Sequence, residues 1–141
     1  MRRNGKSAGC MRAGVDVVWK EEAATARRLD LLVLSGTMID RLIDSMPTDP
    51  RVLATASREA SLVYVFAERV LEMASKTDGD IGDALGNILA HEIGHVLLPE
   101  RGHSSIGIMQ AGYEFRNLSA RRFTAAQAEM IRRDLQNTRA K

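Results

Sequence analysis

The chain has 141 residues, of which 45% are hydrophobic and 27% are charged, and its formal net charge is +2. This length suits one domain, and the hydrophobic content is sufficient for a packed core, so the composition excludes a wholly disordered chain. The basic residues are dispersed toward the two ends, and no nucleic-acid-reading motif accompanies them, so we expect no nucleic acid partner. The single cysteine, Cys10, excludes an internal disulfide and a cysteine-based zinc cage.

The sequence offers no segment for insertion into a membrane. No apolar run approaches the roughly 18 residues that a membrane span needs, so we expect no membrane partner. The basic N-terminus is not followed by the apolar segment of a signal peptide. We therefore expect the chain as written to be cytoplasmic, and to be secreted only if an upstream segment is missing.

Three segments are predicted to be β-strands. Residues 15–19 and 62–66 combine β-branched and aromatic side chains, and residues 29–34 form an apolar run closed by Ser35 and Gly36. Between the first two strands along the chain, residues 21–28 are polar and alanine-rich and predict a connector or a short helix. The strand 62–66 is the clearest of the three.

Helical spacing of apolar residues predicts four helices. One covers residues 38–46 and ends at a turn over 47–50, and a short one covers residues 68–76. A third begins after the N-cap Asp80 and runs to about Leu98, where Pro99 ends it. Its apolar residues cover more than half of its circumference, which is typical of a central, buried helix.

The fourth predicted helix is C-terminal. Thr124 and Gln127 form a capping box at its start, and Ala128, Ile131 and Leu135 give it a buried stripe.

All three histidines of the chain lie within 13 residues, at positions 91, 95 and 103. His91 and His95 are four residues apart on the third predicted helix, so their imidazoles lie on the same face and can bind one metal ion together. His103 follows Pro99 and Gly102 and can supply a third nitrogen where the chain turns back. Three protein ligands and one open position are typical of a catalytic zinc site. We therefore predict one catalytic Zn²⁺ as the cofactor, because zinc suits an all-imidazole ligand set.

Glu92 directly follows the first of these ligands. It lies about 100° further round the helix, from where its carboxylate can reach a water molecule on the same metal ion. The motif His-Glu-x-x-His is the zinc-binding signature of metallopeptidases, with the glutamate as general base. Here the motif lies late on a helix and is followed by a helix-breaking proline and a third histidine.

These residues resemble the metzincin clan of zinc peptidases. The resemblance rests on the segments HEIGH (91–95), HS (103–104) and GIM (107–109), and it is closest to the matrixin-like branch and to a group of small bacterial metzincin-like proteins. A wider and less specific match extends from Ala13 to about Arg133. The resemblance implies one metzincin-like zinc peptidase domain over residues 1–141.

By this resemblance, His91, His95 and His103 would be the zinc ligands and Glu92 the general base and proton shuttle. Met109 would be the methionine of the Met-turn, beneath the metal ion. Tyr113 would be a candidate oxyanion donor, although its spacing differs from that of the tyrosine in some metzincins, and a packing role is the alternative. The expected fold is α+β: a small twisted mixed β-sheet packed on the central active-site helix, with a C-terminal helix on the far side.

The sequence departs from the metzincin pattern in three places. His103 follows His95 by eight residues instead of six, and Leu98 stands at the position of the usual helix-ending glycine. We expect a slightly longer helix, with residues 99–102 as the return loop. Met109 follows His103 after only six residues. Finally, a typical member has a strand and a helix before position 15, so we expect an N-terminally truncated chain, with residues 1–14 disordered or a remnant of the first helix.

The expected function is that of a zinc-dependent metalloendopeptidase acting on a peptide or protein substrate. One alternative is a gluzincin-type regulatory protease, in which Glu114 or Glu129 supplies the third ligand. The other is a non-catalytic, zinc-stabilised domain that keeps the ligands but has lost activity. Substrate sequence, oligomeric state and the strand that would bind a substrate are not readable from the sequence.

Overall fold

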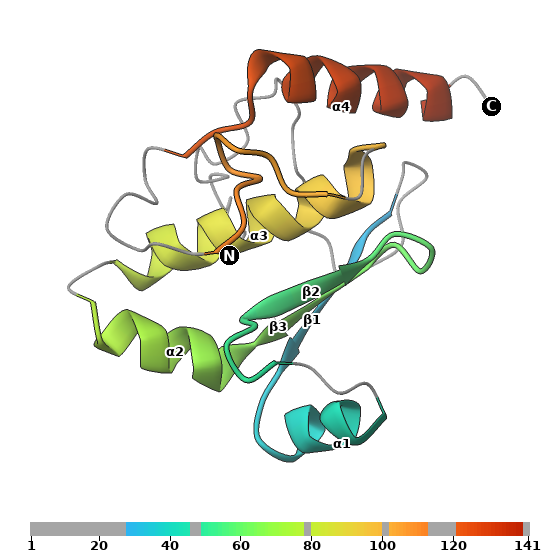
Figure 1. Ribbon diagram of the computed structural model, residues 1–141. Helices are drawn as coiled ribbons and strands as arrows, with labels where there is room; N and C mark the ends of the chain where they lie inside the picture. Colours follow the sequence, from blue (N-terminus) through green and yellow to red (C-terminus); the bar gives the residue numbers. More distant parts are fainter. Residues whose placement is uncertain (1–27, 46–48, 78–79, 100–101, 113–120, 140–141) are drawn as a thin grey trace, which may run out of the picture.

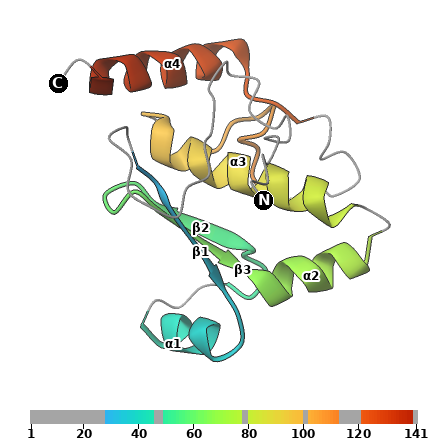
Figure 2. The same ribbon diagram turned by 180° about the vertical axis from the view of Figure 1, so that it is seen from behind.

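The structure, a computed structural model, describes residues 28–45, 49–77, 80–99, 102–112 and 121–139. Within these residues the fold is α+β, as expected, with a three-stranded mixed sheet and four helices. The sheet, helix α3 and helix α4 are stacked in that order, so α3 lies in the middle (Figure 1; Figure 2). The elements are β1 (Asp30–Leu34), α1 (Thr37–Ser45), β2 (Ala54–Ser57), β3 (Leu62–Phe66), α2 (Ala67–Ser75), α3 (Ile81–Leu97) and α4 (Ala125–Arg139).

The sheet has β3 at its centre. Strand β1 pairs with β3 in parallel, and β2 pairs with β3 in the antiparallel direction, so Val65 lies opposite both Val33 and Ala54. The side chains of Val63 and Val65 are buried on the face that packs on α3. The predictions of β1 and β3 are confirmed to within one residue, whereas the predicted strand at 15–19 lies outside the described residues.

Strand β2 was not predicted from the sequence. Its four residues, Ala-Thr-Ala-Ser, carry no large apolar side chain, and only Thr55 is of a type that favours strands. Pairing with β3 and packing of Ala54 against the core outweigh this weak local preference. Among the described residues, β2 is the strand at one edge of the sheet, and it is the strand most closely packed on α3.

Helix α3 is buried on both sides. Ile88 and Val96 pack with the sheet in one hydrophobic cluster, and Ile93 packs with Met109 and Ile131 in a second. The helix begins as predicted, because Asp80 accepts a hydrogen bond from the backbone N–H of Asp83 through Oδ1, at 3.0 Å. Its position between two apolar clusters fixes every side chain that it carries relative to the rest of the molecule.

Helix α4 covers the face of α3 opposite the sheet. Ile131 is fully buried against α3, and Phe123, Met130 and Leu135 pack around the same cluster. The predicted capping box is present, because Thr124 and Gln127 bond reciprocally between side chain and backbone.

The two shorter helices flank the sheet. Helix α1 packs through Ile39 onto Leu34 and Phe66, and α2 packs through Val70 onto the sheet and α3. No helix within the described ranges is both long and apolar enough to cross a lipid bilayer.

Candidate metal centre

Helix α3 supplies two imidazoles to one point. His91 is buried and His95 half-buried, and the one-turn separation places both on the same face. Their Nε2 atoms lie 3.1 Å apart. Two nitrogens that bind one zinc ion at 2.0–2.1 Å with tetrahedral angles are separated by about 3.3 Å. The spacing of these two nitrogen atoms therefore fits a shared metal ion.

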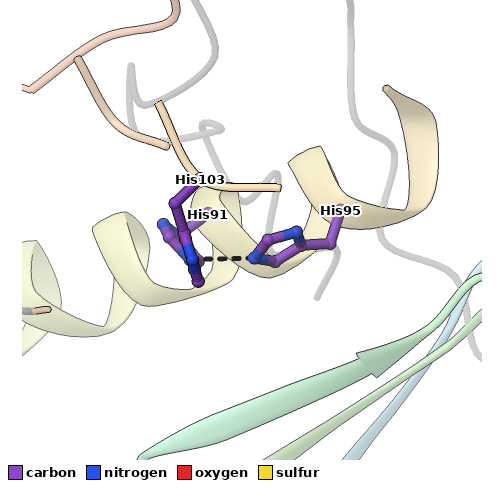
Figure 3. A group of neighbouring side chains, drawn as sticks. All are labelled: His91, His95 and His103. Atoms are coloured by element: carbon purple, nitrogen blue, oxygen red, sulfur yellow. Dashed lines mark hydrogen bonds between the residues drawn. The ribbon is translucent and has the colours of Figure 1, made fainter. Parts of the chain in front are cut away.

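The third imidazole comes from the loop after α3. His103 is exposed, and its ring centroid lies 5.2 Å from that of His91 and 5.0 Å from that of His95. One nitrogen from each of the three rings lies within 4.8 Å of the others, so the three histidines can hold a metal ion together. Figure 3 shows the rings of His91 and His103 side by side, with His95 pointing toward them from the next turn of the helix.

A backbone carbonyl orients the ring of His91. The Nδ1 atom lies 2.7 Å from the carbonyl oxygen of Ile108. A carbonyl can only accept, so the bond requires the proton on Nδ1, and Nε2 is then the unprotonated nitrogen, as a metal ligand must be. The turn around Ile108 thus fixes both the direction and the tautomer of the His91 ring.

The electrostatics of the site favour neutral imidazoles. Burial lowers the pKa of His95 to about 4, and the neighbouring His91 and His103 act in the same direction. Burial also lowers the pKa of His91, while its hydrogen bond to Ile108 opposes the shift. A metal ion binds only the neutral imidazole, so these two residues are in their ligand form at neutral pH.

Met109 packs against α3 at the turn between the two helical ligands. It is only 1% exposed. A Cβ atom added to Gly94 would collide with the Sδ atom of Met109 and would lie 2.9 Å from Cε1 of Phe123. Gly94 therefore allows the methionine to approach the helix directly beside His95. A buried methionine at this place is compatible with both the expected Met-turn role and an ordinary core position.

Glu92 lines the same cleft as the three histidines. The cleft has a volume of ≈ 980 Å³, and its lining also includes Ala54, Thr55 and Ala56 of β2. Glu92 is 5% exposed. It lies on α3 directly after His91, as the sequence predicts. The arrangement provides a carboxylate, three nitrogen ligands and a strand edge around one cavity.

Arg58 is a residue of this cleft that the sequence did not indicate. It lies between β2 and β3, and its Nη1 atom donates a hydrogen bond to the carbonyl oxygen of Leu98, at the end of α3. This bond holds the point from which the chain departs toward His103. The two residues are 40 positions apart, and no local pattern connects them.

Two of the considered residues lie outside the described part of the chain, and a third lies elsewhere in the fold. Tyr113 and Glu114 fall within the undescribed segment 113–120. Glu129 is on α4, where its carboxylate accepts hydrogen bonds from Arg132 and Arg133. It does not belong to the group of residues that can hold a metal ion.

Comparisons with protein-family models, with curated proteins and with solved structures found no match to this chain. The assignment of a function therefore rests on the residues of the site.

The packing at Gly94 generates a test of stability. Alanine stabilises an exposed helical position by about 1 kcal/mol relative to glycine. At position 94 we expect alanine to destabilise the protein instead. The free energy of unfolding should fall by about 1–3 kcal/mol, because the buried Met109 has little room to move away from the new methyl group. Urea unfolding of Gly94→Ala measures the change. The double variant Gly94→Ala/Met109→Ala should lose less free energy of unfolding than the two single variants lose together, because alanine at position 109 removes the collision. A Gly94→Ala protein more stable than the parent would contradict this packing.

The lowered histidine pKa values predict how the metal-free protein responds to acid. The folded-state pKa of His95 is about 4, below its ordinary value of 6.5, and that of His91 is also lowered. Between these pH values the unfolded chain binds more protons than the folded chain. The free energy of unfolding therefore has its full value above about pH 6.5 and decreases as the pH falls toward 4. The urea midpoint of chelator-treated protein should decrease over this range. In the His95→Gln variant the urea midpoint should depend less on pH. A parent protein whose midpoint stays constant over this range would refute the prediction.

Proposed function

We propose that this protein is a zinc-dependent metalloendopeptidase with a metzincin-like fold. The observation that carries the proposal is the convergence of three imidazoles in a cleft that also contains Glu92 and borders an edge strand. Nitrogen ligands from three histidines suit zinc, and a set of three protein ligands leaves a position for water or substrate. The order of the sheet, with two parallel strands and an antiparallel strand beside the helix of the ligands, is compatible with this fold.

In the proposed reaction, the three histidines and Glu92 have separate roles. His91, His95 and His103 would hold the ion, which when bound would lower the pKa of a water molecule toward ~7 and polarise the carbonyl of the scissile bond. Glu92 would take the proton from this water and deliver it to the amine of the leaving group. Both tasks require a carboxylate close to the ligands, and Glu92 is next to the first ligand on a rigid helix.

Strand β2 would position the substrate. It is the edge strand nearest to the histidines among the described residues, and its side chains are small. An extended peptide can add to such an edge through backbone hydrogen bonds, which bind peptides with little regard to their side chains. This mode of binding would place a peptide bond across the cleft between β2 and the metal ligands.

The central test is the substitution Glu92→Gln. It preserves the size of the side chain but removes its basicity, so we expect zinc binding to persist and the cleavage of casein or of a peptide library to fall by about 10²–10⁴-fold. The matched control is Glu59→Gln, because Glu59 is a carboxylate of the same cleft that has no role in the proposed reaction. A Glu92→Gln protein as active as the parent would exclude the mechanism. A parent that binds zinc and cleaves no peptide of the library would instead favour a non-catalytic zinc domain.

A second test separates the proposed ligand set from the gluzincin arrangement. We expect His103→Ala to reduce the zinc retained after dialysis, as measured by elemental analysis, whereas Glu129→Ala should retain as much zinc as the parent. Glu129 is on the surface and paired with two arginines, and exposed ion pairs contribute little to stability, so the Glu129→Ala protein should remain folded. The reverse result, with zinc lost from Glu129→Ala alone, would rule out His103 as the third ligand.

A further inference from the structure

The third ligand is the one that the helix does not hold in place. His91 and His95 take their positions from the backbone of α3, but His103 comes from a loop and its side chain is exposed. A ligand of this kind needs other contacts to keep its ring directed at the metal ion. The residue that follows it, Ser104, makes these contacts.

Three hydrogen bonds fix Ser104. Its backbone N–H donates to the carbonyl oxygen of Met109 at 2.9 Å, and its hydroxyl donates to the carbonyl oxygen of Ile106 at 2.7 Å. The same hydroxyl oxygen accepts a hydrogen bond from Nε2 of Gln127 at 3.3 Å. The first two bonds are internal to the loop, whereas the bond from Gln127 connects the loop to helix α4.

The capping box determines which atom of the Gln127 amide faces Ser104. The backbone N–H of Thr124 donates to Oε1 of Gln127 at 3.0 Å. Only an oxygen can accept this bond, so the other end of the amide is the NH₂ group, and it is a donor toward Ser104. The capping box therefore does two things: it begins α4, and it presents a donor to the residue beside the third ligand.

We propose that Gln127 is a positioning residue for the metal ligand His103. Its amide holds the hydroxyl of Ser104, and through it the backbone from which the His103 ring extends toward His91 and His95. Helix α4 thus contributes to the metal centre without providing a ligand. The inference rests on the proposed metal site, and it adds a residue 23 positions away from Ser104 to the groups that set its geometry.

The test uses variants that separate the two tasks of Gln127. In Gln127→Glu the carboxylate still accepts the bond from Thr124, because a capping box tolerates either residue, but it has no proton to donate to Ser104. Ser104→Ala removes the acceptor and provides a second, independent variant. Thr124→Ala is the matched control: it removes the bond from the Gln127 N–H to Oγ1 of Thr124 and leaves the amide of Gln127 in contact with Ser104.

Zinc affinity is measured in the full chain by competition with a chelator, and ligand geometry by the visible absorption bands of the Co²⁺ form. We expect Gln127→Glu and Ser104→Ala each to weaken zinc binding roughly tenfold and to change the Co²⁺ bands. The double variant should bind zinc no more weakly than Ser104→Ala alone, because Ser104→Ala already removes the bond that Gln127→Glu removes, together with the bond to Ile106. Thr124→Ala should lower the melting temperature and leave both metal readouts unchanged.

Four results would overturn the inference. The first is a Gln127→Glu protein with the affinity and the Co²⁺ spectrum of the parent. The second is an equal loss of affinity in Thr124→Ala, which would assign the effect to the stability of α4. The third is an additive loss in the double variant. In the fourth, the parent takes up no metal ion, which would refute the proposed function as well. A parent that binds zinc without cleaving peptides would refute the proposed reaction but leave the role of Gln127 intact.

Discussion

The site depends on one helix that is buried on both sides and yet carries polar groups. Helix α3 packs between the sheet and α4, and His91 and Glu92 are 4% and 5% exposed. Burial of polar groups costs free energy unless they find partners. For the histidines, burial favours the neutral ring, and the neutral ring is also the form that binds a metal ion. The packing that keeps α3 in place therefore also keeps His91 and His95 in the form that can bind a metal ion.

The two histidines of the helix and the histidine of the loop are held in place by different interactions. On α3 the helical repeat sets the distance between His91 and His95, and the close approach of Met109 at Gly94 fixes the helix against the loop. Beside His103, three hydrogen bonds hold Ser104 in the loop, and by our proposal they also direct the ring of His103. The loop and the helix are further joined by the bond between His91 and the carbonyl of Ile108. His91 and the residue next to His103 therefore bond to the same turn, over residues 106–109.

Local sequence patterns were sufficient for the elements with strong periodicity. The strand Leu62–Phe66, the start of α3 at Asp80 and the capping box of α4 are all encoded by neighbouring residues, and all three were predicted. The i, i+4 spacing also predicted that His91 and His95 share a face. The position of His103 depends on a return loop, and for that residue the expectation rested on the spacing of the motif and on the metzincin resemblance.

The features that were not predicted arise from contacts between distant parts of the chain. Strand β2 forms because β3 is beside it, and its own residues show little preference for a strand. The bond from Arg58 to Leu98 joins residues 40 positions apart, and that from Gln127 to Ser104 joins residues 23 positions apart. Hydrogen bonds of this kind depend on the tertiary fold, so single-sequence patterns contain no signal for them.

The unequal exposure of the three histidines has a consequence for exchange with the solvent. Two of the rings belong to a helix that is enclosed by the core, while the ring of His103 stands at the surface. An ion held by the three histidines could therefore enter or leave if the His103 side chain alone swung outward, without any opening of the hydrophobic clusters. Exchange of such an ion with the solvent would then depend on movement of the His103 side chain, and it would not require the much slower opening of the folded core.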